Sequence, residues 1–273
     1  MAKPKFVIGT CVYNRTHTLP AYFKALAEKT KNPFHLYLVV NYDELWTEAE
    51  ANKAMNEVMT LDNVFPESYT VIYTPNLGLQ GYNIALEAAK ILDVPCFLCN
   101  DDINPITQDW DEELLTIPTE ANVYQQGLKT IRPETVGVLA PTYVNAGCNL
   151  YQEYKENPTE RWYGSVSCIG HAQMITLNAV RKDFKFESEW CGIFGPFDIF
   201  QANWMAYHSL NTVVCRRVCF DFPNSQESAF SNGKPEKFTA KLTPIWEKMH
   251  NLIHKEYREM HLAKYGFNKW WHE

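Results

Sequence analysis

The sequence predicts a single α/β domain in which helices flank a central, mostly parallel sheet. Apolar runs typical of buried strands alternate with helical patterns of about a dozen residues through the first half of the chain. Strands joined by helices pair in parallel through right-handed crossovers, so this alternation predicts a doubly wound sheet. The composition agrees, since 46% of the 273 residues are hydrophobic and 21% are charged, as in ordinary globular proteins.

The first half of the chain contains four predicted strands with three helices between them. FVIGTCV is continuously apolar, as expected for a strand that is buried on both faces. Thr18 is placed to cap the first helix, and Pro20 suits its first turn. The predicted strands are residues 6–12, 35–43, 69–76 and 94–100, and the predicted helices are 18–30, 44–59 and 81–92.

The second half has a less regular pattern and predicts a mixed arrangement. The segment 223–237 is polar, contains Gly and Pro, and predicts a loop that can close over a bound ligand or simply lie on the surface. Thr243 is placed to cap a long amphipathic helix. Strands are predicted at 135–144 and 212–222, with one or two more within 165–177, and helices at 196–210 and 243–266.

Charge and hydropathy exclude several classes of protein. The formal net charge of −7 argues against a protein that mainly coats nucleic acid. No apolar stretch reaches the roughly 18 residues that a transmembrane helix needs, and the N-terminus lacks the pattern of a secretory signal peptide. We therefore expect a cytosolic protein without stable membrane insertion, whose eight cysteines are reduced thiols.

Two adjacent carboxylates follow the fourth predicted strand. In doubly wound sheets, ligands bind beyond the carboxyl ends of the strands, which is where Asp101 and Asp102 lie. Neighbouring carboxylates repel unless a cation joins them, and oxygen ligands favour Mg²⁺ or Mn²⁺. In the alternative interpretation, Asp101 caps the next element and Asp102 is solvated.

Four stretches occur in an order that resembles a known family. They are TCVYNR at 10–15, TPNLGLQGYNIALEAAK at 74–90, FLCNDDINP at 97–105 and FGPFDIFQANW at 194–204. Their order and spacing resemble those of inverting glycosyltransferases of the GT-A fold, close to the large family 2, over roughly residues 5–210. The resemblance implies transfer of a sugar from a nucleotide sugar, with UDP-sugars favoured, to an acceptor hydroxyl with the help of Mn²⁺ or Mg²⁺.

The resemblance also implies a donor site along the carboxyl ends of the strands. For Asp43 an alternative role is the N-cap of the helix predicted at 44–59, and for Asn83 an ordinary place at a helix start. The implied donor-binding residues are Thr10, Tyr13, Arg15, Asp43, Asn76, Gly78, Asn83, Asn100 and Asp101.

The implied metal ligands are Asp102 first and Asp101 second. The family's acidic triplet here reads Asn100-Asp101-Asp102, so an uncharged amide takes the first acidic place. This departure should weaken metal binding or assign Asn100 to a ribose or sugar contact. The family often has a late ligand after its final strand, and Asp221 is the nearest candidate for it.

The same comparison of motifs implies that Asp198 is the general base. An inverting transfer needs a base that takes the proton of the attacking hydroxyl, and aromatic neighbours in FGPFDIF favour a raised carboxylate pKa. The alternative role of Asp198 is a helix N-cap. Glu189 is the reserve base, and His171, Glu187 and Trp190 are candidates for acceptor contacts.

These assignments divide one domain, residues 1–273, into three parts. Residues 1–105 form a nucleotide-sugar-binding half, 106–235 an acceptor and catalytic half, and 236–273 a helical extension. The acceptor that the resemblance implies is a glycan or, since the family includes small phage enzymes that modify such bases, a hydroxymethylated pyrimidine in DNA. The alternatives are a non-catalytic nucleotide-sugar-binding scaffold and a nucleotidyltransferase; CVYNRTHTL lacks the Gly-rich loop that the latter usually has.

Overall fold

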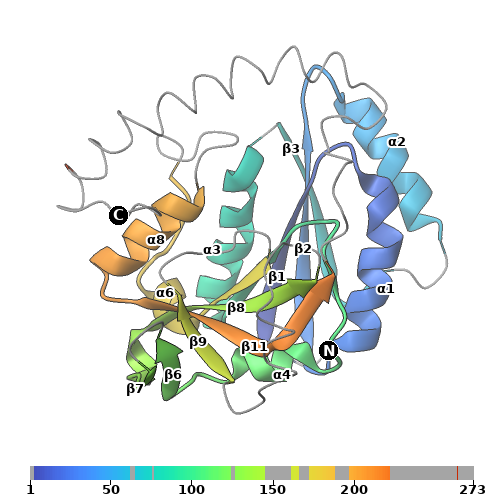
Figure 1. Ribbon diagram of the computed structural model, residues 1–273. Helices are drawn as coiled ribbons and strands as arrows, with labels where there is room; N and C mark the ends of the chain where they lie inside the picture. The colour runs from blue at the N-terminus through green and yellow to red at the C-terminus, as the bar shows by residue number, and fades with distance from the viewer. Residues whose placement is uncertain are drawn as a thin grey trace.

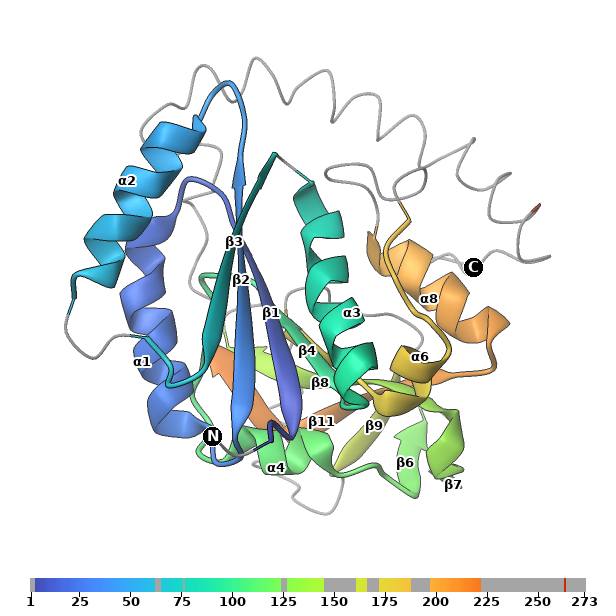
Figure 2. The ribbon, with the colours of Figure 1, turned by 180° about the vertical axis from the view of Figure 1, so that it is seen from behind.

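The structure is a computed structural model that describes residues 3–61, 65–75, 77–123, 127–144, 161–165, 172–187, 197–221 and 263. Within these ranges the strands form one sheet in the order β3-β2-β1-β4-β10-β8-β11-β9-β6-β7, and β5 pairs with β11. Figures 1 and 2 show this sheet between helices on both faces. The predicted α/β class is therefore confirmed.

The first half is the parallel, doubly wound part. Each of the neighbouring pairs β3-β2, β2-β1 and β1-β4 runs parallel. The strands are β1 (Phe6–Val12), β2 (Phe34–Tyr42), β3 (Tyr69–Pro75) and β4 (Cys96–Cys99). The connecting helices are α1 (Leu19–Lys29), α2 (Glu48–Met59) and α3 (Tyr82–Leu92), with short 3₁₀ turns η1 (Thr16–Thr18) and η2 (Gly78–Gly81).

The second half is mixed, as the sequence pattern predicts. Strand β10 runs antiparallel to both β4 and β8, whereas β8 and β11 are parallel. The strands are β5 (Asn104–Pro105), β6 (Glu120–Val123), β7 (Gly127–Thr130), β8 (Val136–Val144), β9 (Trp162–Ser165), β10 (Ala172–Ile175) and β11 (Asn211–Asp221). The helices are α4 (Trp110–Leu115), α6 (Leu177–Arg181) and α8 (Phe197–Tyr207), with the 3₁₀ turn η3 (Pro133–Thr135).

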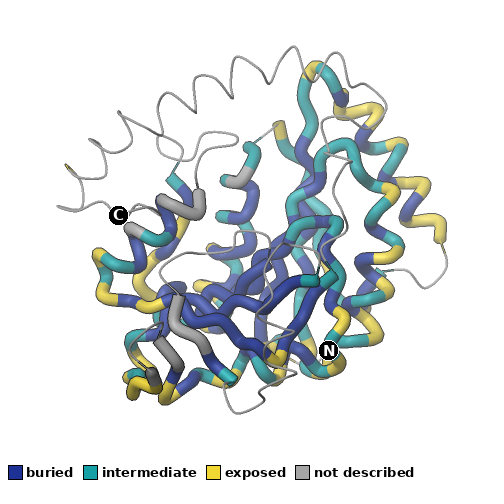
Figure 3. Tube along the Cα trace, viewed as in Figure 1, coloured by how far each residue is buried: buried dark blue, intermediate teal, exposed yellow. Residues whose placement is uncertain are grey.

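Two hydrophobic cores lie on the two faces of the sheet. Alternate residues of β1 divide between them: Phe6 and Ile8 pack with α1, α2 and α4, whereas Val7 packs with α3, α6 and α8. Successive side chains of a strand point to opposite faces, so a strand covered on both sides must be apolar throughout. Figure 3 shows the resulting run of buried residues through the central strands.

Several boundaries differ from the sequence-based prediction. Helix α2 begins at Glu48 rather than at 44, because Thr47 and Glu50 form a capping box that fixes its start. The interpretation of Asp43 as the N-cap of this helix is therefore wrong. The short elements α4, α6 and the β6-β7 hairpin were not predicted, and the predicted loop 223–237 and helix 243–266 lie outside the described residues.

No helix in the described part of the chain combines the length and the apolar character needed to cross a bilayer.

Gly9 allows a close approach between β1 and α3. A Cβ at Gly9 would lie 2.6 Å from the Cβ of Ala85 and 3.2 Å from Cδ2 of Leu98. We expect Gly9→Ala to lower the free energy of unfolding by about 1–3 kcal/mol, as overpacked cores do, measured by urea denaturation. Adding Ala85→Gly removes the opposing methyl group, so the double variant should lose less than the sum of the single variants. Strict additivity would contradict the described packing.

Candidate functional site

The carboxyl ends of β1, β2 and β4 bring three loops to one edge of the sheet. Because β1 pairs in parallel with both β2 and β4, the segments 13–15, 41–43 and 100–102 leave the sheet side by side. Asn14 adopts a positive φ of 55°, a conformation that Asn tolerates better than most residues, and so turns the chain toward η1. This local turn places the next residue, Arg15, opposite the loop after β4.

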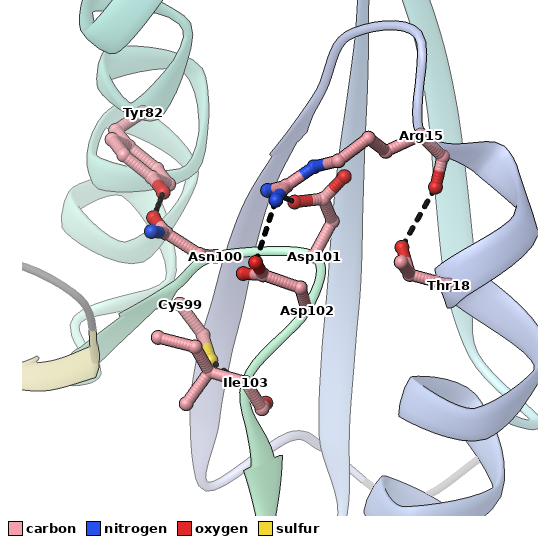
Figure 4. Close-up of polar contacts among 8 residues, drawn as sticks. All are labelled: Arg15, Thr18, Tyr82, Cys99, Asn100, Asp101, Asp102 and Ile103. Carbon is pink, nitrogen blue, oxygen red and sulfur yellow. Dashed lines mark hydrogen bonds and ion pairs between the residues drawn. The ribbon is translucent and has the colours of Figure 1, made fainter. Parts of the chain in front are cut away.

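Arg15 is held at both ends. Its carbonyl oxygen accepts hydrogen bonds from the hydroxyl of Thr18 at 2.7 Å and from the backbone N–H of Thr18 at 3.1 Å. Its guanidinium donates to Oδ1 of Asp101 and to Oδ2 of Asp102, each at 2.6 Å. Figure 4 shows the side chain spanning the loops to reach both carboxylates. Arg15 is thereby in direct contact with two other predicted site residues, Asp101 and Asp102, which lie 86 and 87 positions later in the sequence.

Asp101 is buried and Asp102 is partly buried, and this changes the electrostatics of the pair. Only 4% of the Asp101 side chain and 13% of the Asp102 side chain are exposed. Burial raises the pKa of Asp101 to about 7; the positive charge of Arg15 opposes this shift and the negative charge of Asp102 adds to it. One guanidinium thus faces two carboxylates in a site from which water is largely excluded.

Three buried oxygen atoms of this loop are left without hydrogen-bond partners among the described residues. They are Oδ2 of Asp101, Oδ1 of Asp102 and Oδ1 of Asn104. Buried polar atoms in native proteins almost always have a partner, so such a cluster calls for a ligand. Carboxylate and amide oxygens are the donor set that Mg²⁺ and Mn²⁺ accept. The residues present therefore fit a hard divalent cation.

The cation would need further ligands from a substrate. Among the described residues, no group of three or more His, Cys, Asp and Glu side chains could enclose a metal ion. A cage of that kind is not required when Mg²⁺ binds through one or two carboxylates and substrate phosphates complete its shell. Asp221 ends β11 opposite Asn104 of β5, with a half-buried side chain, and its role as a ligand stays a prediction.

A second polar group lies at the ends of β1 and β2. The Tyr13 hydroxyl donates to Oδ1 of Asp43 at 2.8 Å, and the backbone N–H groups of Leu45 and Trp46 donate to the same oxygen at 2.7 and 3.1 Å. The rings of Tyr13 and Trp46 meet edge to face at 5.7 Å. Burial and the carboxylate of Asp43 raise the pKa of Tyr13, so its hydroxyl stays protonated. Trp46 was missed by sequence reasoning, although an aromatic residue next to NYDE is a usable signal.

Further predicted donor residues contact the scaffold. The hydroxyl of Tyr82 donates to Oδ1 of Asn100 at 2.9 Å, and buried Thr10 shares a 2.7 Å hydrogen bond with the Tyr22 hydroxyl. Asn83 exchanges two hydrogen bonds with the backbone of Phe186, at 2.7 and 2.8 Å. Asn83 therefore ties α3 to the segment after α6. The described contacts of the three predicted donor residues, Thr10, Asn83 and Asn100, are made with other parts of the protein fold.

Gly78 opens the 3₁₀ turn that leads into α3. Its φ of 54° is one that glycine adopts readily. Before it, the N–H of Leu77 donates to Oδ1 of buried Asn41 at 3.2 Å. Asn41 was not predicted, although a lone amide within the apolar run LYLVVNY signals a specific hydrogen bond. These contacts fix the loop after β3 beside the loop after β2.

Comparisons with known proteins bear on the fold. No protein-family model and no curated sequence matches the chain. Three solved structures resemble it: the mannosyltransferase PcManGT from Pyrobaculum calidifontis with GDP-Man and Mn²⁺, GalNAc-T7 with UDP, GalNAc and Mn²⁺, and S. aureus TarS 1-349 with UDP-GlcNAc. The TM-scores are 0.54, 0.58 and 0.55 at 12%, 11% and 13% identity. The chain has the GT-A glycosyltransferase fold.

The GT-A likeness covers most of this chain but only part of the others. The matches include 85%, 94% and 88% of this chain, and 60%, 54% and 65% of PcManGT, GalNAc-T7 and TarS respectively. The similarity expected from the four sequence stretches is thus confirmed at the level of fold. Activity and substrates do not follow from likeness at such low identity.

The residues predicted for the base and for acceptor contacts are described only in part. Asp198 is the second residue of α8, so its backbone lies within the first helical turn rather than at the N-cap; its side chain lies outside what the structure describes. Glu187 is half-buried at the end of the described segment 172–187. The predicted residues Asn76, His171, Glu189 and Trp190 lie outside the described residues.

Proposed function

We propose that the protein is a metal-dependent, inverting glycosyltransferase that moves a sugar from a nucleotide sugar to an acceptor hydroxyl. The observation that carries this proposal is the Asp101-Asp102 pair at the carboxyl end of β4, in which Asp101 is buried and one oxygen of each carboxylate lacks a hydrogen-bond partner in the described part of the chain. It lies in a GT-A fold, and the Tyr13-Asp43 pair flanks it on the neighbouring strands. Residues 1–105 are then the donor half.

The donor is proposed to lie across the ends of β1, β2 and β4. Asp101 and Asp102 would hold Mn²⁺ or Mg²⁺, which when bound neutralises the charge of the departing diphosphate. Tyr13 and Asp43 border the place for the base, and Asn100 lies on the α3 side, near a ribose or sugar. A uridine nucleotide is favoured because GalNAc-T7 and TarS were determined with UDP and UDP-GlcNAc.

Asp198 is proposed to take the proton from the acceptor hydroxyl. The hydroxyl oxygen forms a bond to the anomeric carbon as the bond from that carbon to the diphosphate oxygen breaks, and the leaving oxygen keeps the electron pair. The configuration at the anomeric carbon is thereby inverted. The proton moves to a carboxylate oxygen, a task for which a positioned carboxylate typically contributes a factor of about 10²–10⁴.

The second candidate function is binding of a nucleotide sugar without transfer. It is favoured by one observation: the positive charge of Arg15 already neutralises part of the acidic pair, where Asn100 replaces an acidic residue. A site of this kind would bind nucleotide yet form no product.

Sugar transfer tests the proposal directly. The full chain is incubated with Mn²⁺ and radiolabelled UDP-sugars, and label is measured in oligosaccharides, in DNA that contains 5-hydroxymethylcytosine or 5-hydroxymethyluracil, and in unmodified DNA as the matched control. We expect label in one acceptor class, loss of label with EDTA, and no label in unmodified DNA. If the protein binds a nucleotide but neither transfers the sugar of any donor nor hydrolyses it, the binding scaffold is favoured.

A further inference from the structure

A single arginine occupies the place between the two carboxylates of the acidic pair. Arg15 contributes one charge-assisted hydrogen bond to each of Asp101 and Asp102, both at 2.6 Å. Its own side chain is only 11% exposed. Charge-assisted bonds of this length inside a protein are strong, so the guanidinium is the counterion of the pair in the structure as it stands.

Among the described residues, the charges in this site do not cancel when both carboxylates are ionised. Two adjacent carboxylates face one guanidinium, and one oxygen of each carboxylate is buried without a hydrogen-bond partner among the described residues. A divalent cation would satisfy these oxygens and the remaining negative charge. It would also repel the guanidinium, because two cations bound to the same carboxylates disfavour each other.

The backbone of Arg15 is anchored, whereas its side chain can rotate away from the carboxylates. Its carbonyl oxygen stays bonded to Thr18 at the end of η1, so the backbone has a fixed position. The three methylene groups of an arginine side chain nevertheless allow the guanidinium to swing between partners. Its planar fork matches the oxygens of a phosphate as well as those of a carboxylate.

We infer that Arg15 is a built-in counterion that competes with the divalent cation for Asp101 and Asp102, and that it passes to the nucleotide diphosphate when both ligands bind. The second part rests on the proposed function; the first does not. Arg15 is thus a positioning residue. It weakens binding of the cation alone. The cation and the nucleotide strengthen each other's binding, because both bind better when the Arg15 guanidinium has left the carboxylates.

The test is a calorimetric titration of the full chain with Mn²⁺ alone and with Mn²⁺ in the presence of UDP. In Arg15→Gln, Mn²⁺ alone should bind roughly tenfold to a hundredfold tighter than in wild type, the usual range of coupling between two ligands. UDP should strengthen Mn²⁺ binding in wild type but much less in Arg15→Gln. The matched control is Arg181→Gln, because Arg181 also pairs with a carboxylate, Asp93, but at an exposed position. Its Mn²⁺ affinity should equal that of wild type.

Stability gives a second readout. Arg15→Gln leaves two buried carboxylates facing each other, so this variant should melt below wild type, and Mn²⁺ should raise its melting temperature more than that of wild type. If the glutamine variant does not fold even with Mn²⁺, Arg15→Lys decides. A lysine keeps the charge but presents one compact ammonium instead of a fork, so Mn²⁺ should still bind more tightly than in wild type.

The outcomes separate this inference from the proposed function. Mn²⁺ binding that is equal or weaker in the Arg15 variant than in wild type overturns the counterion role, whatever the nucleotide does. Tighter Mn²⁺ binding in Arg15→Gln, together with no binding of any nucleotide to either protein, supports the counterion role and contradicts the proposed function.

Discussion

Replacement of Asp102 by alanine is expected to weaken Mn²⁺-dependent binding of UDP by about a hundredfold or more, since even outer-shell partners of a metal typically contribute 10–100-fold. The physical reason is the loss of the principal proposed ligand, whose Oδ1 is buried without a hydrogen-bond partner in the described part of the chain. The measurement is a UDP titration at saturating Mn²⁺ by calorimetry. Binding of UDP without metal should change far less.

Two further variants make this result specific. Asp102→Asn keeps the shape of the side chain and removes its charge, so it should also lose most of the Mn²⁺-dependent affinity. Asp93→Ala removes a carboxylate that is 58% exposed and paired with Arg181, and it should bind UDP as wild type does. Undiminished Mn²⁺-dependent binding by Asp102→Ala would show that the cation binds elsewhere.

Asp198→Asn is expected to lower the rate of sugar transfer by about 10²–10⁴-fold, the usual contribution of a general base. An amide cannot accept the proton, while the site near Asp101 and Asp102 is unchanged. Affinity for UDP with Mn²⁺ should therefore stay within about twofold of wild type, because the base acts on the acceptor in the transition state. Single-turnover transfer and UDP calorimetry, made on the same preparation, check both statements.

The reserve base gives the matched comparison. Glu189→Gln should transfer sugar at close to the wild-type rate if Asp198 is the base. A large loss of rate in Glu189→Gln, with a normal rate in Asp198→Asn, would move the role to Glu189. Equal and complete losses of UDP binding in both variants would instead indicate a structural effect.

The fold was predictable to the extent that periodicity encodes it. Continuous apolar runs identified β1 and β4, because a strand covered on both faces has no polar side. The β6-β7 hairpin was not predicted because each strand has only four residues and neither EANV nor GLKT is strongly apolar. The start of α2 was misplaced because Asp43 competed with the stronger capping signal of Thr47 and Glu50.

The site was predictable as a location but not as a set of contacts. A strand end followed by two acidic residues is a local signal, and it placed Asp101 and Asp102 at the ligand edge of the sheet. That Arg15 binds both carboxylates depends on the turn at Asn14 and on the pairing of β1 with β4. The same is true of Asn83, which is bonded to the backbone of Phe186 103 residues away. Contacts of this kind arise from tertiary structure and produce no periodic pattern in the amino-acid sequence.

Thermal unfolding with UDP, GDP, CMP and dTDP, each with and without Mn²⁺, tests whether Asp101 and Asp102 form a metal-dependent nucleotide site. A ligand at about one hundred times its dissociation constant stabilises a protein by roughly 2.7 kcal/mol, which corresponds to a rise of about 5 °C in melting temperature for a chain of this size. We expect a rise of this order with one nucleotide, UDP above all, that requires Mn²⁺ and disappears in Asp102→Ala. No rise with any nucleotide at millimolar concentration, in the presence of Mn²⁺, would contradict a nucleotide-sugar site at Asp101 and Asp102.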